Sequence, residues 1–296
     1  MSGRTVEGRV AVGDHEDLRP SRRLDGSGTL AGVDDGTPGG SGRAGGGADS
    51  DVRRGAGVDR GTLYARLRGE LVGLLRGRPP TDLDVAVPAT PGWMVRDVLA
   101  HVVALPADLN ARRFPTGDPD AWTAAQVAAR RGRDLDELAA EWECEGPTFE
   151  EGLRLLGDEI GSHFAADLLV HATDVREALG VGVPDDPVAV DVALDHYLGA
   201  AHQRLEEAGV GTLVVTTDGD RWALGRGPER AWLAAPPVEV LRATSGRWDE
   251  ARIRSLEWSG DVDAVLPLLS AYPLPRRTSS PSTLASPGSD PAPDTT

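Results

Sequence analysis

Apolar residues recur at three- and four-residue intervals through the middle of the chain. Residues 59–77 carry leucines on one helical face, at Leu63, Leu67, Leu71, Leu74 and Leu75, and this spacing predicts an amphipathic helix. Thr90-Pro91 and Asp118-Pro119 each place an N-cap residue before a proline. Because proline is favoured at the first helical position, we expect a helix to begin at each pair.

Three further helices are expected before the pattern changes. A short one runs through Leu135, Leu138 and Trp142, and a long one begins at the capping box Thr148–Glu151 and ends at Gly180. Another covers about 187–208. Helices joined by such short connections favour an up-and-down bundle.

After Gly209 the pattern becomes that of a small α+β unit. Residues 212–217 and 221–224 read as two strands joined by a turn at 218–220. Residues 238–243 look helical, 253–258 extended and 261–269 helical. We place the domain boundary near 209, giving a helical domain at 58–208 and an α+β domain at 209–275. The helix at 187–208 fits either side.

The two ends of the chain differ from this middle. Residues 1–57 are rich in Gly, Asp, Arg and Ser, and residues 276–296 in Ser, Pro and Thr. Segments with so few apolar residues cannot bury enough surface to offset the entropy of ordering them. We therefore expect a disordered N-terminal extension, or sequence upstream of the true start, and a disordered tail.

Composition narrows the classes of function. The chain of 296 residues has 47 acidic residues against 31 Lys and Arg, a formal net charge of -16. Such a charge disfavours nucleic acid and anionic membrane surfaces as partners. The single cysteine, Cys144, excludes an internal disulfide and a Cys-based zinc site, and its acidic neighbours disfavour a reactive thiolate. With no apolar leader or span, we expect a cytoplasmic protein.

His101 lies within the apolar run 98–103, where a histidine faces the bundle interior or its edge. Taken alone, it is more simply interpreted as a core histidine bonded to one neighbour, such as Asp97. Asp167 and His171 change that weighting. They are four residues apart on one helical face among apolar residues, with no Lys or Arg within one turn of Asp167. A metal ion is a candidate partner for this carboxylate, and a protonated His171 is the alternative.

Together, His101, Asp167 and His171 form a set of two imidazoles and one carboxylate that suits Zn²⁺ with an open fourth position, or another divalent ion. His163, one turn before Asp167, lies too far along the helix from His171 to share an ion easily, so we place it at the rim. Asp174 is expected to orient His171, or to pair with Arg176 or another exposed partner. His196 and His202 are interpreted as surface residues.

These residues resemble a known family. The segment from Thr90 to His101 is similar to the TPGW-x-V-x-D-L-x-x-H segment of the mycothiol-dependent maleylpyruvate isomerase family. The segment 167–180 is similar to the family's second segment, in which an acid and a histidine four apart precede Asp-x-Arg and Ala-Leu-Gly. Residues 241–247 and 258–263 resemble two short C-terminal elements. The resemblance covers about residues 59–275.

This resemblance implies a fold and a metal site. The family combines an N-terminal DinB-like four-helix bundle with a small sterol-carrier-like α/β domain, and the bundle holds one divalent metal, usually zinc. Carried over, the metal ligands are His101, Asp167 and His171. The chain departs from the family at Asp167, where the characterised isomerase has glutamate. The shorter side chain would bring the metal closer to the helix and leaves the substrate chemistry open.

The resemblance also implies an activity. We expect a metal-dependent enzyme that uses mycothiol as thiol cosubstrate and acts on a small electrophilic molecule through a metal-bound thiolate, as an isomerase or an S-transferase. Arg247 is a candidate for holding a substrate carboxylate, although a structural salt bridge is as good an interpretation. The alternative function is a non-enzymatic zinc protein that binds a ligand or partner. The sequence leaves the substrate and the oligomeric state unknown.

Overall fold

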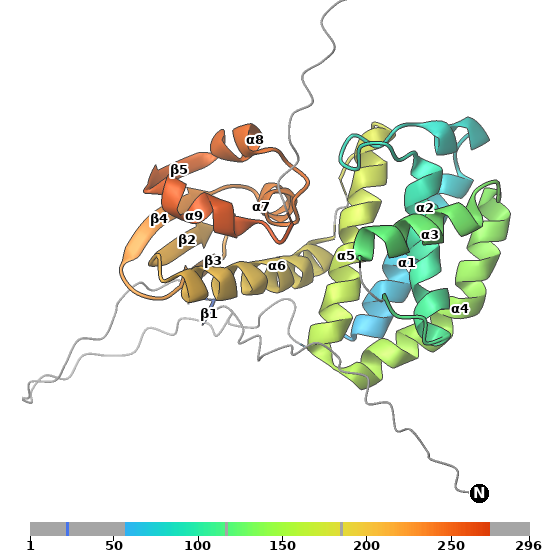
Figure 1. Ribbon diagram of the computed structural model, residues 1–296, viewed down its shortest axis with the longest axis horizontal. Helices are drawn as coiled ribbons and strands as arrows, with labels where there is room; N and C mark the ends of the chain where they lie inside the picture. The colour runs from blue at the N-terminus through green and yellow to red at the C-terminus, as the bar shows by residue number, and fades with distance from the viewer. Residues whose placement is uncertain (1–21, 24–56, 116–117, 184–185, 273–296) are drawn as a thin grey trace, which may run out of the picture.

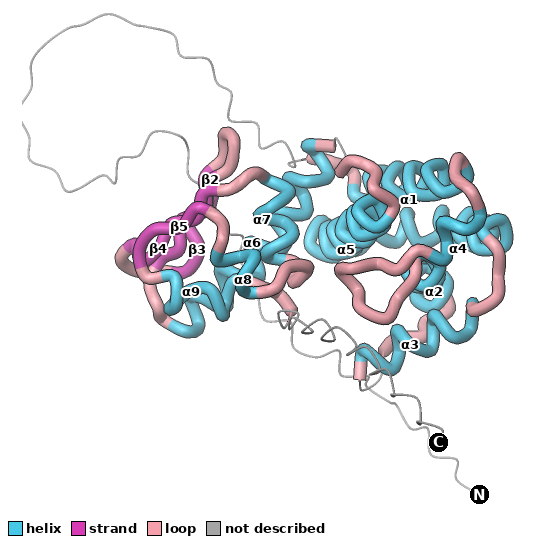
Figure 2. Tube along the Cα trace, turned by 90° about the horizontal axis from the view of Figure 1, so that it is seen from above, coloured by secondary structure: helices cyan, strands magenta, loops and turns pink. Residues whose placement is uncertain are grey.

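The computed structural model describes residues 22–23, 57–115, 118–183 and 186–272. The expected disordered ends therefore lie outside the described residues, except for Gly57 and the two-residue strand β1, Arg22–Arg23. Helices make up the first half of the described chain, and a mixed sheet with short helices makes up the second (Figures 1 and 2). The predicted order of a helical bundle followed by a small α+β unit is confirmed.

Four long helices pack around one core in the first half. They are α1 (Arg60–Arg76), α2 (Val95–Asn110), α4 (Leu135–Leu156) and α5 (Asp158–Ala178). The short helix α3 (Pro119–Arg130) packs on α2, and a 3₁₀ turn, η1 (Pro80–Asp84), lies between α1 and α2. Each long helix buries its apolar face, as the fully buried Leu63, Leu99, Trp142 and Leu169 illustrate.

Two predicted helix starts have different outcomes. Asp118 caps α3 and Pro119 is its first residue, as predicted. The start predicted at Thr90-Pro91 is wrong, because α2 begins only at Val95. Backbone bonds from Val87 N to Trp93 O and from Val95 N to Val85 O hold the preceding segment against residues 85–87. The Asp97 carboxylate then accepts from the Met94 N–H and closes the first turn.

The long helix predicted from Thr148 to Gly180 is also wrong. The short helix expected around Trp142 instead continues through Pro147 as α4 and ends at Leu156, and Gly157, with φ of 89°, separates it from α5. Proline removes one backbone hydrogen bond from the helix interior. Trp142 and Leu153 lie on either side of it and are both buried, so continuous packing outweighs that loss.

The second half is built on α6 (Pro187–Ala208) and a sheet of strand order β1-β3-β2-β4-β5. β2 (Thr212–Thr216) and β3 (Arg221–Gly225) form the predicted hairpin. β4 (Glu229–Ala234), which was not predicted, runs parallel to β2, and β5 (Glu257–Gly260) is antiparallel to β4. Three short helices complete the unit: α7 (Pro237–Thr244), α8 (Glu250–Arg254) and α9 (Val262–Leu269).

Helix α6 touches both halves of the molecule, since it contacts α5 as well as β3, α7 and α9. In Figure 1 it runs from α5 to lie alongside the sheet. The extended segment expected at 253–258 is wrong at its start, where Ile253 and Arg254 complete α8. Within the described ranges, no helix is long and apolar enough to span a bilayer.

Candidate metal centre

His101, Asp167 and His171 meet where α2 packs against α5. Their ligand atoms all lie within 4.8 Å of one another. The sequence separation of 66 residues between His101 and Asp167 is closed by the packing of the two helices, while Asp167 and His171 share one face of α5 because they are one turn apart. The three residues predicted as a set are therefore neighbours in the described structure.

The two imidazole rings lie close together in an edge-to-face arrangement. Their centroids are 5.2 Å apart with planes at 77°, and the Trp93 ring lies 5.6 Å from that of His101. Nε2 of His171 is 3.6 Å from Oδ1 of Asp167. Both histidines are buried. The arrangement is thus a small polar cluster enclosed by apolar helix faces and one tryptophan.

The donor set fits a divalent ion. In a tetrahedral zinc site with bonds of about 2.0–2.1 Å, neighbouring ligand atoms are about 3.3 Å apart. The distance of 3.6 Å between His171 Nε2 and Asp167 Oδ1 is close to this value. Burial, followed by the proximity of His171, lowers the pKa of His101 to about 4. His101 is consequently neutral near pH 7, as a metal ligand must be.

Asp167 supplies the negative charge. Burial has the largest effect on its pKa and raises it, but His171 and His101, with smaller contributions from His163 and Arg247, lower it. The net result is a pKa below the usual value for aspartate. The carboxylate is therefore ionised at neutral pH although it lies in a mostly buried place.

The outer nitrogen of each histidine faces a polar side chain. Nδ1 of His101 is 2.9 Å from Oε1 of Gln126 on α3. Nδ1 of His171 is 3.5 Å from Oδ2 of Asp174, one turn further along α5. In His101 the contact of Nδ1 with Gln126 leaves Nε2 available to an ion. In His171 Nδ1 makes no hydrogen bond to the described residues, and Nε2 is the nitrogen that lies next to Asp167.

Asp174 is fully buried and pairs with cations of the second half of the chain. Nε of Arg247 donates to its Oδ2 at 2.9 Å, and Arg242, itself buried, forms an ion pair with its Oδ1. The pairing with Arg176 considered from the sequence is not formed, since Arg176 donates to the Gly182 carbonyl. Burial has the largest effect on the pKa of Asp174 and raises it, but the contact with His171 and the two arginines outweigh it, so the pKa is well below its usual value.

Arg247 lies between the two halves. Its Nη1 donates to the Ser245 carbonyl at 3.2 Å, and its side chain is 13% exposed. Its Nη2 has no hydrogen-bond partner among the described residues. Burial lowers the pKa of Arg247 most strongly, but Asp174 more than compensates and the net shift is upward. The two roles considered for Arg247, a structural salt bridge and the binding of a substrate carboxylate, are therefore compatible. Arg247 makes a structural ion pair with Asp174 and keeps Nη2 free of hydrogen bonds to the described residues.

The remaining histidines divide between rim and scaffold. His163 is exposed, as predicted for the rim, and its Nδ1 is 3.3 Å from Nε2 of His196. The surface positions predicted for His196 and His202 are wrong. His196 is half-buried, and His202, 12% exposed, accepts a hydrogen bond from the Gly225 N–H at 3.0 Å. Cys144 is exposed on α4.

Sequence reasoning missed Gln126 and Arg242. Gln126 is 25 residues from His101, and its spacing gives no indication that α3 folds back onto α2. Arg242 lies within the segment 241–247 that carries the family resemblance, but a basic residue in a short amphipathic helix reads as solvent-exposed. Its burial against Asp174 depends on the packing of the two halves.

Comparison with known proteins agrees with the predicted resemblance. Residues 64–163 match the family model described as the mycothiol maleylpyruvate isomerase N-terminal domain. This match confirms the resemblance of the helical part to that family. It includes His101 and Gln126 but ends before Asp167 and His171. No curated protein sequence matches the chain significantly.

Two solved structures are similar to the chain. They are crystal structures of the mycothiol-dependent maleylpyruvate isomerase and of a point mutant of it, at 18% and 17% identity. Each match covers 69% of this chain and 93% of the other, with a TM-score of 0.44. Similarity at this level supports no inference about activity.

Proposed function

We propose that this chain is a metal-dependent enzyme that uses mycothiol either to isomerise a small electrophilic molecule or, as an S-transferase, to attach the thiol to it. The observation that carries the proposal is the convergence of His101, Asp167 and His171, with ligand atoms within 4.8 Å of one another. The match of residues 64–163 to a domain of mycothiol-dependent isomerases suggests the cosubstrate. The ion we propose is zinc, because the set contains two imidazoles and one carboxylate.

The chain itself would hold the ion and shape its surroundings. His101 and His171 would bind through Nε2 and Asp167 through a carboxylate oxygen, leaving a coordination position open. When bound, the ion would supply Lewis acidity that lowers the pKa of a thiol placed next to it. Trp93, beside His101, would help to exclude water from this position.

The nucleophile would come with the cosubstrate. Cys144, the one cysteine, lies exposed on α4 and outside the His101–Asp167–His171 cluster. Sulfur would add to a carbon–carbon double bond conjugated to a carbonyl, with the π electrons moving to the carbonyl oxygen. Rotation about the former double bond and expulsion of the thiolate would give the isomer. Protonation of the enolate adduct by solvent, or displacement of a leaving group that departs with its bonding electrons, would give the S-conjugate instead.

Arg247 would hold an anionic group of the substrate. Its Nε and Nη1 are engaged by Asp174 and the Ser245 carbonyl, so the guanidinium is fixed while Nη2 stays available. A carboxylate is the natural acceptor for such a donor. We also propose a cytoplasmic location, where the unpaired cysteine would stay reduced.

Metal analysis of purified variants tests the site. We expect His101→Ala, Asp167→Ala and His171→Ala each to lose most bound zinc, and His163→Ala, which alters the exposed rim, to keep it. Retention of zinc in all three variants would rule out the site. A second assay follows thiol consumption with mycothiol and a generic electrophile. A zinc-loaded protein that consumes no thiol across varied electrophiles would instead be a non-enzymatic binding protein.

A further inference from the structure

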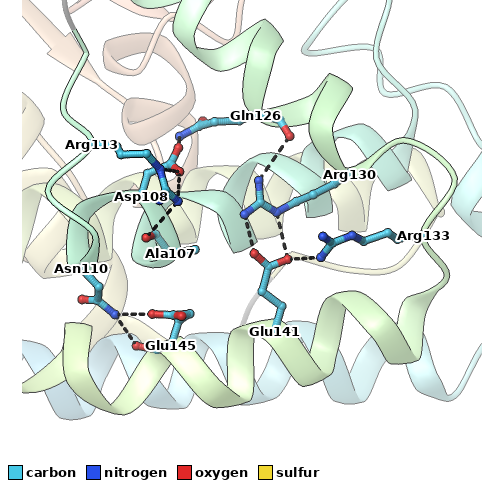
Figure 3. A network of polar contacts seen from close by, with 9 residues as sticks. All are labelled: Ala107, Asp108, Asn110, Arg113, Gln126, Arg130, Arg133, Glu141 and Glu145. Carbon is cyan, nitrogen blue, oxygen red and sulfur yellow. Dashed lines mark hydrogen bonds and ion pairs between the residues drawn. The ribbon is translucent and has the colours of Figure 1, made fainter.

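A chain of hydrogen-bonded side chains leads from the surface of the bundle to His101. At its outer end is Arg113, whose Nε and Nη2 donate to Oδ1 of Asp108 at 3.0 and 2.8 Å (Figure 3). A guanidinium can only donate and a carboxylate can only accept, so the direction of these bonds is fixed by chemistry. Asp108 is buried, and this pairing holds its carboxylate in place.

The second link orients an amide. Nε2 of Gln126 lies 2.8 Å from Oδ2 of Asp108. Because an ionised carboxylate accepts only, the NH₂ end of the amide must face Asp108, and the carbonyl end must face away from it. The two ends of a glutamine are otherwise hard to tell apart, but here Asp108 decides between them.

The third link fixes the histidine. Oε1 of Gln126 lies 2.9 Å from Nδ1 of His101, and both side chains are buried. Since a carbonyl oxygen cannot donate, Nδ1 must carry the hydrogen. Neutral imidazole has one protonated nitrogen, so Nε2 keeps its lone pair. His101 offers one ring nitrogen to the cluster with Asp167 and His171, and because Nδ1 is hydrogen-bonded to Gln126 we assign that nitrogen as Nε2.

Gln126 is itself held by the fold. Nη1 of Arg130 donates to the Gln126 backbone carbonyl at 3.4 Å, and Arg130 pairs through its Nε with Glu141 of α4 at 3.1 Å (Figure 3). These contacts tie α3 to α4, and α3 also packs on α2. The Gln126 backbone is thus held in place, and its buried amide is fixed by its own bonds to Asp108 and His101.

We propose that Gln126 is a positioning residue that sets the tautomer and ring orientation of His101, with Asp108 and Arg113 fixing the direction of its amide. The proposal rests on the proposed function, because it assigns His101 Nε2 to the metal. It goes beyond that function by placing a neutral amide, rather than a carboxylate, behind one histidine. The other histidine faces the charged Asp174.

Two measurements on the full-length protein test the proposal. Long-range ¹H–¹⁵N NMR correlations of the metal-free protein at pH 7.5 report which His101 nitrogen is protonated. We expect Nδ1–H in the wild type, and a mixture or Nε2–H in Gln126→Leu. Competition with a chelator then gives zinc affinity. We expect a 10- to 100-fold loss in Gln126→Leu, the range typical of groups that orient metal ligands.

A second variant distinguishes loss of the amide orientation from a general loss of folding. In Asp108→Asn the shape is kept, but the new amide can present NH₂ to Gln126, which lets the Gln126 amide reverse and favours Nε2–H on His101. We expect this tautomer and weaker zinc binding with Gln126 intact. Asn110→Ala is the control, since Asn110 lies two residues from Asp108 but donates to Glu145 of α4. It should leave both readouts unchanged.

The proposal is overturned if His101 keeps Nδ1–H and zinc affinity stays within twofold of wild type in both Gln126→Leu and Asp108→Asn. It is also overturned if Nδ1 of His101 is unprotonated in the metal-free wild type. Failure of the proposed function looks different: a wild type that binds no zinc removes the metal site, while the metal-free NMR measurement still decides what Gln126 does to His101.

Discussion

Arg247 donates to Asp174 across the boundary between the two halves of the chain, with 2.9 Å between Nε and Oδ2. Asp174 also faces His171 at 3.5 Å and pairs with Arg242. One fully buried carboxylate is therefore in contact with a residue of the candidate metal centre and with two arginines of the second half. The environment of the site depends on the contact between the halves.

This relationship predicts a large effect of Asp174→Asn. Loss of the charge leaves two arginines without their buried partner, and breaking such a pair costs about 3–5 kcal/mol. Urea unfolding should report a decrease of this size. The control is Glu177→Gln, which removes the other carboxylate paired with Arg242 but at a 39% exposed position, and should cost less than about 1 kcal/mol. Equal effects of the two changes would contradict the prediction.

The packing of α1 on α4 predicts opposite effects at two glycines of α1. A Cβ added at Gly61 would lie 2.2 Å from the Glu150 backbone oxygen, whereas one added at Gly69 meets nothing within 4 Å. Gly61→Ala should destabilise the protein by about 1–3 kcal/mol through overpacking. Gly69→Ala should stabilise it by about 0.5–1 kcal/mol, because alanine favours the helix. Thermal or urea unfolding of both variants checks the difference in sign.

His196 predicts a pH dependence of stability in the metal-free protein. Burial, and then the nearby His163, lowers its pKa to about 4 from the model-peptide value of 6.5. The unfolded chain therefore binds a proton between pH 6.5 and 4 that the folded chain does not, so stability falls as pH falls through this window. The shift corresponds to about 1–2 kcal/mol between pH 7.5 and 5.

Unfolding of His196→Asn at the two pH values measures this contribution. The variant should lose less stability than the wild type on going from pH 7.5 to pH 5. Asn110→Ala, which removes no ionisable group, should keep the wild-type pH dependence. The same dependence in His196→Asn as in the wild type would show that another group is responsible. Asp174 affects stability only at lower pH. Because its pKa is lower in the folded chain than in the unfolded chain, its stabilising contribution is lost only as pH falls below about 4.

Zinc should stabilise the folded chain. Binding to the native state alone adds about 2.7 kcal/mol at a free zinc concentration 100 times the Kd. A thermal shift assay should show a rise in Tm that EDTA reverses. The rise should be absent in His171→Ala, which removes a ligand, when the zinc-dependent shift of each variant is compared with its own metal-free Tm. A full zinc-dependent shift in His171→Ala would argue against binding at this cluster.

Local sequence patterns predicted the proximity of His101, Asp167 and His171 better than they predicted the helix ends. Asp167 and His171 share a face by helical geometry, and their apolar surroundings indicated burial. His101 joins them only because α2 packs on α5, and the sequence suggested that contact through chemistry rather than spacing. Gln126 was missed because its hydrogen bond to His101 links α3 to α2. The spacing of apolar residues within each helix does not indicate which helices pack together.

The errors in the fold have a similar origin. The continuation of α4 through Pro147 is favoured by Trp142 and Leu153, which pack into one core on either side of the proline. The parallel pairing of β4 with β2 is a non-local contact, and only Ala231 and Leu233 of β4 are buried. A run so poor in β-branched residues gives little indication of a strand.

Helix α6 has a consequence for cooperativity. Its 22 residues form one uninterrupted element that contacts α5 of the bundle and β3, α7 and α9 of the sheet unit. Neither half can unfold without exposing one side of this helix, and separating them would also leave the Asp174 charge and the arginines without partners. The two halves, although distinct in architecture, are therefore expected to melt in a single two-state transition.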